Sequence, residues 1–240
     1  MIPPLHEDLD FNCPLSSERA DRLLDHLGPL AGNHVVDLGC GWGELLLRAA
    51  ARGAVALGID QDADAIAHAR ASATARGVTA AFETGDATAW TGTADVIVVN
   101  GSTHIWSTTE GALNTLRGSL RPAGRLLMGE CYWRTEPTTA QLAEMPMTRE
   151  EYGTLPQLVD LALTCGYRPL HIAEASPDEW NDFQSRHALG YEKWLAANPT
   201  HPEHAAITTK ADNHRRAWLH GWHGVLGMAY LILWAPPMTT

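Results

Sequence analysis

The chain has 240 residues, of which 45% are apolar, and carries a formal net charge of −11. This length suits one α/β domain with a well-filled core, with or without a small cap. No apolar run approaches the roughly 18–20 residues of a membrane-spanning helix, and no lysine and arginine cluster suits a phosphate backbone, so we expect neither membrane nor nucleic-acid binding.

The beginning of the chain is rich in proline and polar residues and predicts an N-terminal arm over residues 1–20, which includes the start of the first helix. A serine cap and the leucines that follow predict that helix from Ser16 or Ser17 to Leu27. The chain start lacks the basic and apolar pattern of a signal peptide, and the four cysteines form no C-x-x-C pair. We therefore expect a cytoplasmic protein with free thiols.

The segment that follows, residues 35–44, reads Val-Val-Asp-Leu-Gly-Cys-Gly-Trp-Gly-Glu. It predicts a buried strand over His34–Leu38, a glycine turn, and a helix from Glu44 to about Arg52. Glycines suit a turn that takes positive φ and lets a ligand approach the backbone. The G-x-G-x-G spacing differs from the G-x-G-x-x-G of dinucleotide-binding proteins, which disfavours a nucleotide-dependent oxidoreductase.

Strands and helices continue to alternate up to residue 130. The expected strands are 54–59, 78–83, 94–100 and 125–130, and the expected helices are 62–76 and 108–120. Strand 94–100 is almost continuously apolar, as is typical of a parallel strand buried on both faces. This alternation predicts a doubly wound α/β sheet, Rossmann-like and mostly parallel.

The second half departs from this rhythm. We expect an irregular flap over residues 131–153, a helix at 154–165 and a strand at 167–175. A helical cap rich in tryptophan and histidine is expected at 178–222, inserted before a final apolar strand at 225–234. The chain is thus expected to form a single domain over residues 1–240, with its core at 21–130.

From Asp37 to Glu130 the chain resembles the class I S-adenosylmethionine (SAM)-dependent methyltransferases, whose last strand is antiparallel. The resemblance matches Asp60 to the acid that accepts hydrogen bonds from the ribose hydroxyls, and Asp86 to the acid that reads the adenine amino group. It matches the segment after strand 94–100 to the place of the reacting methyl group. The cofactor-binding residues that it implies are Asp37, Gly39, Cys40, Gly41, Gly43, Asp60, Gln61, Gly85, Asp86, Ala87, Asn100 and Ser102.

Three later stretches resemble a poorly characterised bacterial subfamily of small-molecule methyltransferases. They are residues 129–134, 154–167, and 191–199 with the late 221–224. The subfamily carries a similar N-terminal arm, which implies that Asn12 closes over SAM. Residues 100–103 read Asn-Gly-Ser-Thr instead of the Asn/Asp-Pro-Pro-aromatic motif of many nitrogen methyltransferases. Methylation of nucleobase or glutamine nitrogen is therefore disfavoured.

Methyl transfer is an in-line displacement that depends mainly on alignment, and it needs a base only for a protonated nucleophile. His104 is the candidate base, or else it only lines the pocket. Glu130 is the candidate that orients a substrate amine or hydroxyl, or else makes a cap or loop contact. Tyr132, Trp133 and Trp222 are candidates for the substrate-binding wall, with packing as the alternative.

Two histidine pairs, His201-x-x-His204 and His220-x-x-His223, have a spacing that suits metal ligands on a helix. No acid or cysteine pattern completes either set, and Pro202 interrupts the first pair. We therefore expect no metal.

The sequence as a whole predicts a methyltransferase that moves the methyl group of SAM to a small molecule and yields S-adenosylhomocysteine. The acceptor atom stays open among O, N, C and S, and the protein is expected to be a monomer or homodimer. The alternatives are a protein or RNA methyltransferase, and a catalytically silent SAM-binding sensor or partner protein.

Overall fold

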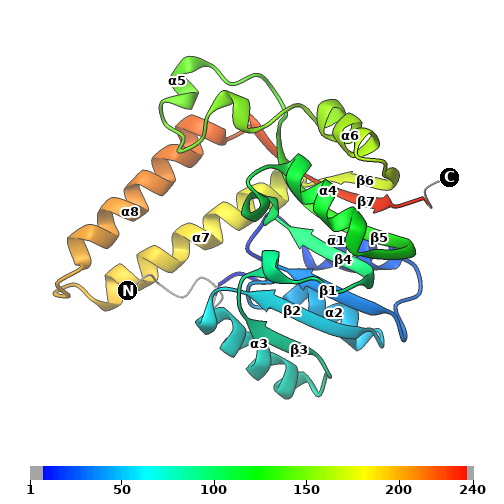
Figure 1. Cartoon of the computed structure of the whole chain (residues 1–240). Coiled ribbons are helices and arrows are strands. Elements are labelled where there is room, and N and C mark those ends of the chain that lie inside the picture. Colours follow the sequence, from blue (N-terminus) through cyan, green and yellow to red (C-terminus); the bar gives the residue numbers. More distant parts are fainter. Residues whose placement is uncertain (1–7, 237–240) are drawn as a thin grey trace.

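A seven-stranded sheet forms the centre of the computed structural model, which describes residues 8–236 (Figure 1). The strands lie in the order β3-β2-β1-β4-β5-β7-β6. They are β1 His34–Leu38, β2 Val55–Asp60, β3 Ala81–Thr84, β4 Ala94–Asn100, β5 Leu120–Trp133, β6 Arg168–Glu174 and β7 Leu226–Trp234. The pairs from β3 to β5 are parallel, whereas β7 is antiparallel to both of its neighbours. The predicted mostly parallel sheet with an antiparallel last strand is confirmed.

The helices cover both faces of this sheet. They are α1 Ser17–His26, α2 Glu44–Ala51, α3 Ala63–Arg76, α4 Thr109–Ser119, α5 Thr139–Leu142, α6 Leu155–Thr164, α7 Pro177–Ala197 and α8 His204–Arg216. Shorter turns are the 3-10 helices η2 Ala87–Ala89, η3 Thr103–Trp106 and η4 Arg149–Glu151, and the π-helical η5 Ala217–Trp222. Side chains of Ser16, Asp62 and Thr108 accept hydrogen bonds from first-turn N–H groups, which explains where α1, α3 and α4 begin.

Two apolar layers hold the helices on the sheet. One layer joins α1, α2 and α3 to strand residues such as Val35 and Val96, and the other joins α4 and α6 to residues such as Val36 and Ile97. Consecutive strand residues thus point to opposite layers and are buried in both. This double burial explains the continuous apolar runs of the central strands.

Strand β5 differs from its prediction because it continues to Trp133, so the predicted flap does not begin at residue 131. Tyr132 pairs with Gly227 and Trp133 with Leu226 on β7. A Cβ at Gly227 would lie 2.3 Å from the Tyr132 ring, so the glycine makes room for that ring. The extension depends on an antiparallel partner almost a hundred residues away, which the local sequence does not reveal.

The segment predicted as a helical cap comprises α7, α8 and η5. Helices α7 and α8 form a hairpin that projects from the sheet, and η5 returns the chain to β7 (Figure 1). Among residues 8–236, no helix combines the length and apolar character that crossing a membrane requires.

Candidate cofactor and catalytic site

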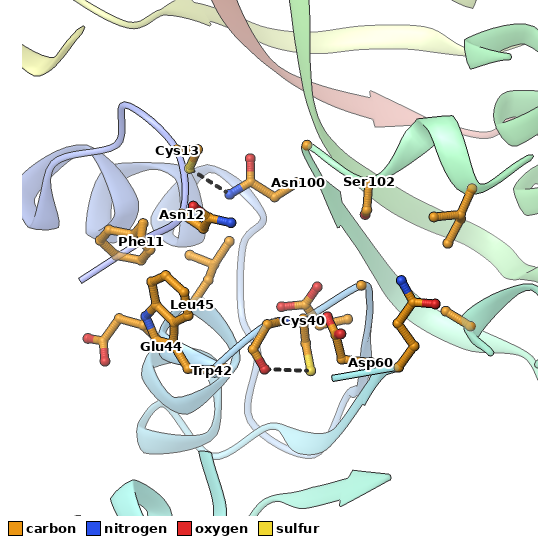
Figure 2. Close-up of a pocket in the computed structure, with 18 of the residues that line it drawn as sticks. Phe11, Asn12, Cys13, Cys40, Trp42, Glu44, Leu45, Asp60, Asn100 and Ser102 are labelled. Atoms are coloured by element: carbon orange, nitrogen blue, oxygen red, sulfur yellow. Dashed lines mark hydrogen bonds between the residues drawn. The ribbon is translucent and has the colours of Figure 1, made fainter. Parts of the chain in front are cut away.

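A cavity of about 620 Å³ lies at the carboxyl ends of β1, β2 and β4 (Figure 2). Volumes of this size are typical of sites for small molecules and cofactors. Every residue that the sequence assigned to the cofactor lines it: Asp37, Gly39, Cys40, Gly41, Gly43, Asp60, Gln61, Gly85, Asp86, Ala87, Asn100 and Ser102. The sheet therefore brings together segments that are more than sixty residues apart in the sequence.

The glycine loop after β1 forms the floor of this cavity. Gly39 has a φ of 80°, and a Cβ there would lie 2.5 Å from the Cβ of Ser102. The Ser102 hydroxyl donates a hydrogen bond to the Leu38 carbonyl over 2.7 Å. Gly41, with a φ of 54°, has open space where its side chain would be. The loop therefore fits tightly against the end of β4 and leaves its backbone accessible to a ligand.

Asp60 ends β2 beside this loop. Its Oδ2 accepts a hydrogen bond from the Gly41 N–H at 2.7 Å, and its Oδ1 accepts one from the Asp62 N–H at 3.0 Å. A carboxylate oxygen has capacity for more than one hydrogen bond, so both oxygens can also accept bonds from two adjacent hydroxyl groups. The geometry of Asp60 suits a ribose.

Asp37 is only 3% exposed at the end of β1. Burial, and secondarily the charge of Asp60, raise the pKa of Asp37 to about 8. A cation in the cavity would favour the ionised carboxylate and offset its desolvation. SAM carries such positive charge on its sulfonium and its amino group, so this buried acid fits the cofactor.

Asp86 begins the 3-10 turn η2 on the opposite wall. Its Oδ1 accepts hydrogen bonds from both the N–H and the hydroxyl of Thr88, at 2.8 and 2.7 Å. These bonds, the hydroxyl bond first, lower the pKa of Asp86. Both bonds from Thr88 end on Oδ1, so Oδ2 can accept a bond from an amino group.

The N-terminal arm supplies another wall (Figure 2). Asn12 lines the cavity together with its neighbours Asp10, Phe11 and Cys13. The Trp42 indole donates a hydrogen bond to the Asp10 carbonyl at 2.7 Å. On the other side of the arm, the Asn100 amide lies 3.2 Å from the Cys13 sulfur. Of these wall residues only Asn12 was predicted from the sequence. Trp42 also lines the cavity, and its position between two glycines of the turn was a sequence signal for that role.

His104 lies on η3, directly after β4, and its exposed side chain lines the same cavity. Glu130 is not among the residues that line it and is 7% exposed. The Glu130 carboxylate accepts hydrogen bonds from the hydroxyls of Thr103 and Thr109 and from the Cys131 N–H. Burial raises the pKa of Glu130 despite these bonds. The structure thus favours a loop contact for Glu130 over direct contact with a substrate, because its carboxylate is already hydrogen-bonded to η3.

The three aromatic residues proposed for the substrate wall do not line the cofactor cavity. The Tyr132 hydroxyl donates to Glu174, and the Trp133 indole donates to the Arg149 carbonyl at 2.9 Å, with both side chains nearly fully buried. Trp222 instead lines a separate cavity of about 110 Å³ beneath α7 and η5. Tyr132 and Trp133 therefore pack the end of β5, and Trp222 belongs to the cap.

The histidine pairs considered for a metal lie in the cap and its connections. Within the described range 8–236, no three histidine, cysteine or acidic side chains gather as metal ligands would.

Known proteins resemble this chain in sequence and in fold. A family model described as a methyltransferase domain matches residues 35–124. The uncharacterized protein YjhP of Escherichia coli K12 is 32% identical over 193 residues, which cover 78% of each chain. A SAM-dependent methyltransferase from Thiobacillus denitrificans, solved with S-adenosyl-L-homocysteine, superimposes with a TM-score of 0.88 at 27% identity and 96% coverage of both chains.

A second such structure is a SAM-dependent methyltransferase from Geobacter sulfurreducens, also in complex with S-adenosyl-L-homocysteine. It has a TM-score of 0.89 at 27% identity and covers 97% of this chain and 99% of its own. These similarities span the sheet, the glycine loop and the cap, and the cavity fits the cofactor. The chain belongs to the class I SAM-dependent methyltransferases, in a family that includes YjhP.

Proposed function

We propose that this methyltransferase transfers the methyl group of SAM to a small-molecule acceptor. The observation that carries the proposal is that the N-terminal arm, which α7 holds in place, closes one side of the cofactor cavity. Asp8 of the arm pairs with Lys193, and Glu179 binds Ser16 and Arg19 at the arm's other end. A protein or RNA acceptor would need an open groove at this edge of the sheet.

Bound SAM would supply an electrophilic methyl group on sulfur, with S-adenosylhomocysteine as the leaving group. In this proposal Asp60 holds the ribose, Asp86 contacts the adenine amino group, and Asp37 balances positive charge. The glycine loop and Asn100 border the remaining part of the cavity. These residues contribute alignment, which is the main requirement of an in-line displacement.

The proposed base is His104. It is carried by η3 at the carboxyl end of β4, and its imidazole would accept a proton from a hydroxyl, thiol or ammonium acceptor. Glu130 is assigned a positioning role, because it binds Thr103, the residue immediately before His104.

Label transfer from methyl-labelled SAM into a bacterial extract tests the function. The extract is separated into small-molecule, protein and RNA fractions after incubation with wild type, Asp60→Ala or His104→Ala. We expect label in the small-molecule fraction with wild type and its loss with both variants. If only Asp60→Ala loses the label, the methyltransferase activity would be supported, and the role of His104 as the base would be contradicted.

Label in the protein or RNA fraction would overturn the small-molecule proposal. Tight S-adenosylhomocysteine binding without label in any fraction, across extracts from several growth conditions, would favour the silent sensor instead.

The compartment and organisation complete the proposal. All four cysteines are free, and free thiols suit the reducing cytoplasm. We propose one domain in which the arm, the segment from residue 134 to 153 and the cap surround the acceptor, in a monomer or homodimer.

A further inference from the structure

Trp42 joins the glycine turn to the N-terminal arm on one side of the cofactor cavity. Its indole Nε1 donates the hydrogen bond to the Asp10 carbonyl at 2.7 Å, and the two residues are 32 positions apart in the sequence. Both line the cavity, and Figure 2 shows Trp42 on the same side as Phe11 of the arm. We call this contact the Trp42 bridge.

The arm end of the Trp42 bridge is firmly held. Leu9, Phe11 and Cys13 are each at most 6% exposed, so the residues on either side of Asp10 are buried in the core. The Arg48 guanidinium also lies over the Phe11 ring, 5.5 Å from its centre. Lifting the arm would expose these apolar side chains to water, which is unfavourable. The Asp10 carbonyl is therefore a fixed acceptor.

The other end of the bridge has more freedom. Trp42 lies between Gly41 and Gly43, which take φ values of 54° and 78°. Glycine moves through this region of backbone space with little steric cost, and Gly41 has open space beside its α-carbon. The Trp42 side chain is half-buried and Asp10 is exposed. Water can therefore satisfy both groups of the hydrogen bond when the indole moves away.

The bridge connects two unbroken stretches of the cavity wall. One stretch is the arm, residues 10–13, and the other is the glycine turn with the start of α2, residues 39–45. A cofactor in the cavity lies between these stretches. With the hydrogen bond formed, the indole spans the space from one stretch to the other.

We propose that Trp42 is a positioning residue for the cofactor, and that its indole leaves the Asp10 carbonyl before S-adenosylhomocysteine is released. The bridge forms over a cofactor that has already entered, so it sets the residence time of the ligand and not its rate of entry. Differences in affinity among variants of one site commonly lie in the dissociation rate. This inference concerns the cofactor alone and is independent of the acceptor that is methylated.

Linkage gives the proposal a second consequence. A ligand that leaves only through the open bridge binds the closed form more tightly, and it therefore lowers the population of the open form. Bound S-adenosylhomocysteine should then protect the Trp42 indole N–H from exchange with solvent. A tryptophan that only packs against the arm would not respond to the ligand.

Trp42→Phe tests the bridge, because it keeps an aromatic ring and removes the N–H donor. We expect S-adenosylhomocysteine to dissociate up to about ten-fold faster, as the loss of one hydrogen bond allows, with the association rate changed less than about two-fold. A chase of radiolabelled S-adenosylhomocysteine with unlabelled ligand measures dissociation. Titration calorimetry gives Kd, and the two values together give the association rate.

Trp218→Phe is the matched control. Trp218 lines the small cavity of the cap and not the cofactor cavity, so the same exchange of rings should leave both rates unchanged. An unchanged dissociation rate in folded Trp42→Phe would overturn the inference. A slower association with normal dissociation would also overturn it, because Trp42 would then shape the empty site.

A measurement on wild type keeps the proposal testable if Trp42→Phe does not fold. The Trp42 indole N–H signal of nitrogen-15-labelled protein is identified by its proximity to the amide protons of Gly41 and Gly43. We expect saturating S-adenosylhomocysteine to slow hydrogen exchange of this N–H at least roughly ten-fold. Equal exchange with and without the ligand would contradict the bridge. Neither experiment depends on the fraction in which transferred methyl label is found.

Discussion

Asp60 links the glycine loop to the position proposed for the ribose. It already accepts hydrogen bonds from the Gly41 and Asp62 N–H groups, so its carboxylate is oriented before any ligand arrives. Such orientation reduces the entropy lost on binding. We therefore expect Asp60 to contribute to affinity both directly and through the loop.

Asp60→Ala should weaken S-adenosylhomocysteine binding by at least roughly 100-fold, because two hydrogen bonds to a charged acceptor are lost. Titration calorimetry measures the affinity, and circular dichroism shows whether the fold is intact. Asp64→Ala, in the exposed first turn of α3, is the matched control and should bind normally. Unchanged affinity in Asp60→Ala would contradict the assignment of this acid to the cofactor.

Glu130 is the buried carboxylate proposed to position His104 without lining the cofactor cavity. Glu130→Ala would leave the Cys131 N–H and the Thr103 hydroxyl without their partner, at about 1–3 kcal/mol each. We expect kcat to fall at least ten-fold with little change in the KM for SAM, since η3 moves and the glycine loop does not. Glu130→Gln, which keeps the shape, retains one oxygen for the Cys131 N–H and can donate its amide N–H to the threonine hydroxyls, should restore most of kcat. A raised KM for SAM with normal kcat would instead place Glu130 in cofactor binding.

Helices α1 and α7 are joined by one carboxylate. Glu179 accepts hydrogen bonds from the hydroxyl of Ser16 at 2.6 Å, the Nε of Arg19 at 2.8 Å and the N–H of Ser176 at 2.8 Å. Burial opposes its ionisation, but the bonds from Arg19 and Ser16 prevail and lower the pKa of Glu179 to about 2. The arm and the cap are thereby held together at the beginning of both helices.

This lowered pKa predicts how the contribution of Glu179 depends on pH. A carboxyl whose pKa is depressed in the folded state stabilises the fold above its unfolded pKa, near 4.5, and loses that contribution as the pH falls toward 2. Glu179→Gln should therefore lower the free energy of unfolding by up to about 3 kcal/mol at pH 7 and by progressively less at pH 4 and pH 3. Urea denaturation measures it, with Asp178→Asn on the exposed first turn of α7 as the charge control. A difference between wild type and Glu179→Gln that is constant from pH 7 to pH 3 would contradict this account.

The elements of the cofactor half were predictable because their signals are local. His34–Leu38 and Ala94–Asn100 are apolar runs that end at polar residues, and α3 is bounded by Asp62 and Gly77, which are typical residues at helix ends. The extension of β5 was not predictable, because its pairing with β7 joins distant segments. The buried positions of Tyr132 and Trp133 depend on that pairing, so they could not be predicted from the sequence either.

At the scale of the molecule, one edge of the sheet gathers the cofactor residues from the ends of several strands. The glycine motif and the acids after β2 and β3 indicated this edge from the sequence, since their backbone requirements are specific. The cap left no comparable motif in the sequence. Tryptophan and histidine at helical spacing have many packing solutions, and only the folded arrangement shows which atoms lack partners.

The burial of Cys13 has a consequence for how the enzyme withstands oxidants. Burial is the main cause that raises the pKa of Cys13 to about 12, and it also raises the pKa values of Cys40 and Cys131. At pH 7 only about one Cys13 in 10⁵ would be a thiolate, the form that reacts with peroxides and electrophiles. We therefore expect the Cys13 thiol, at the junction of the arm and the cofactor cavity, to react slowly with oxidants.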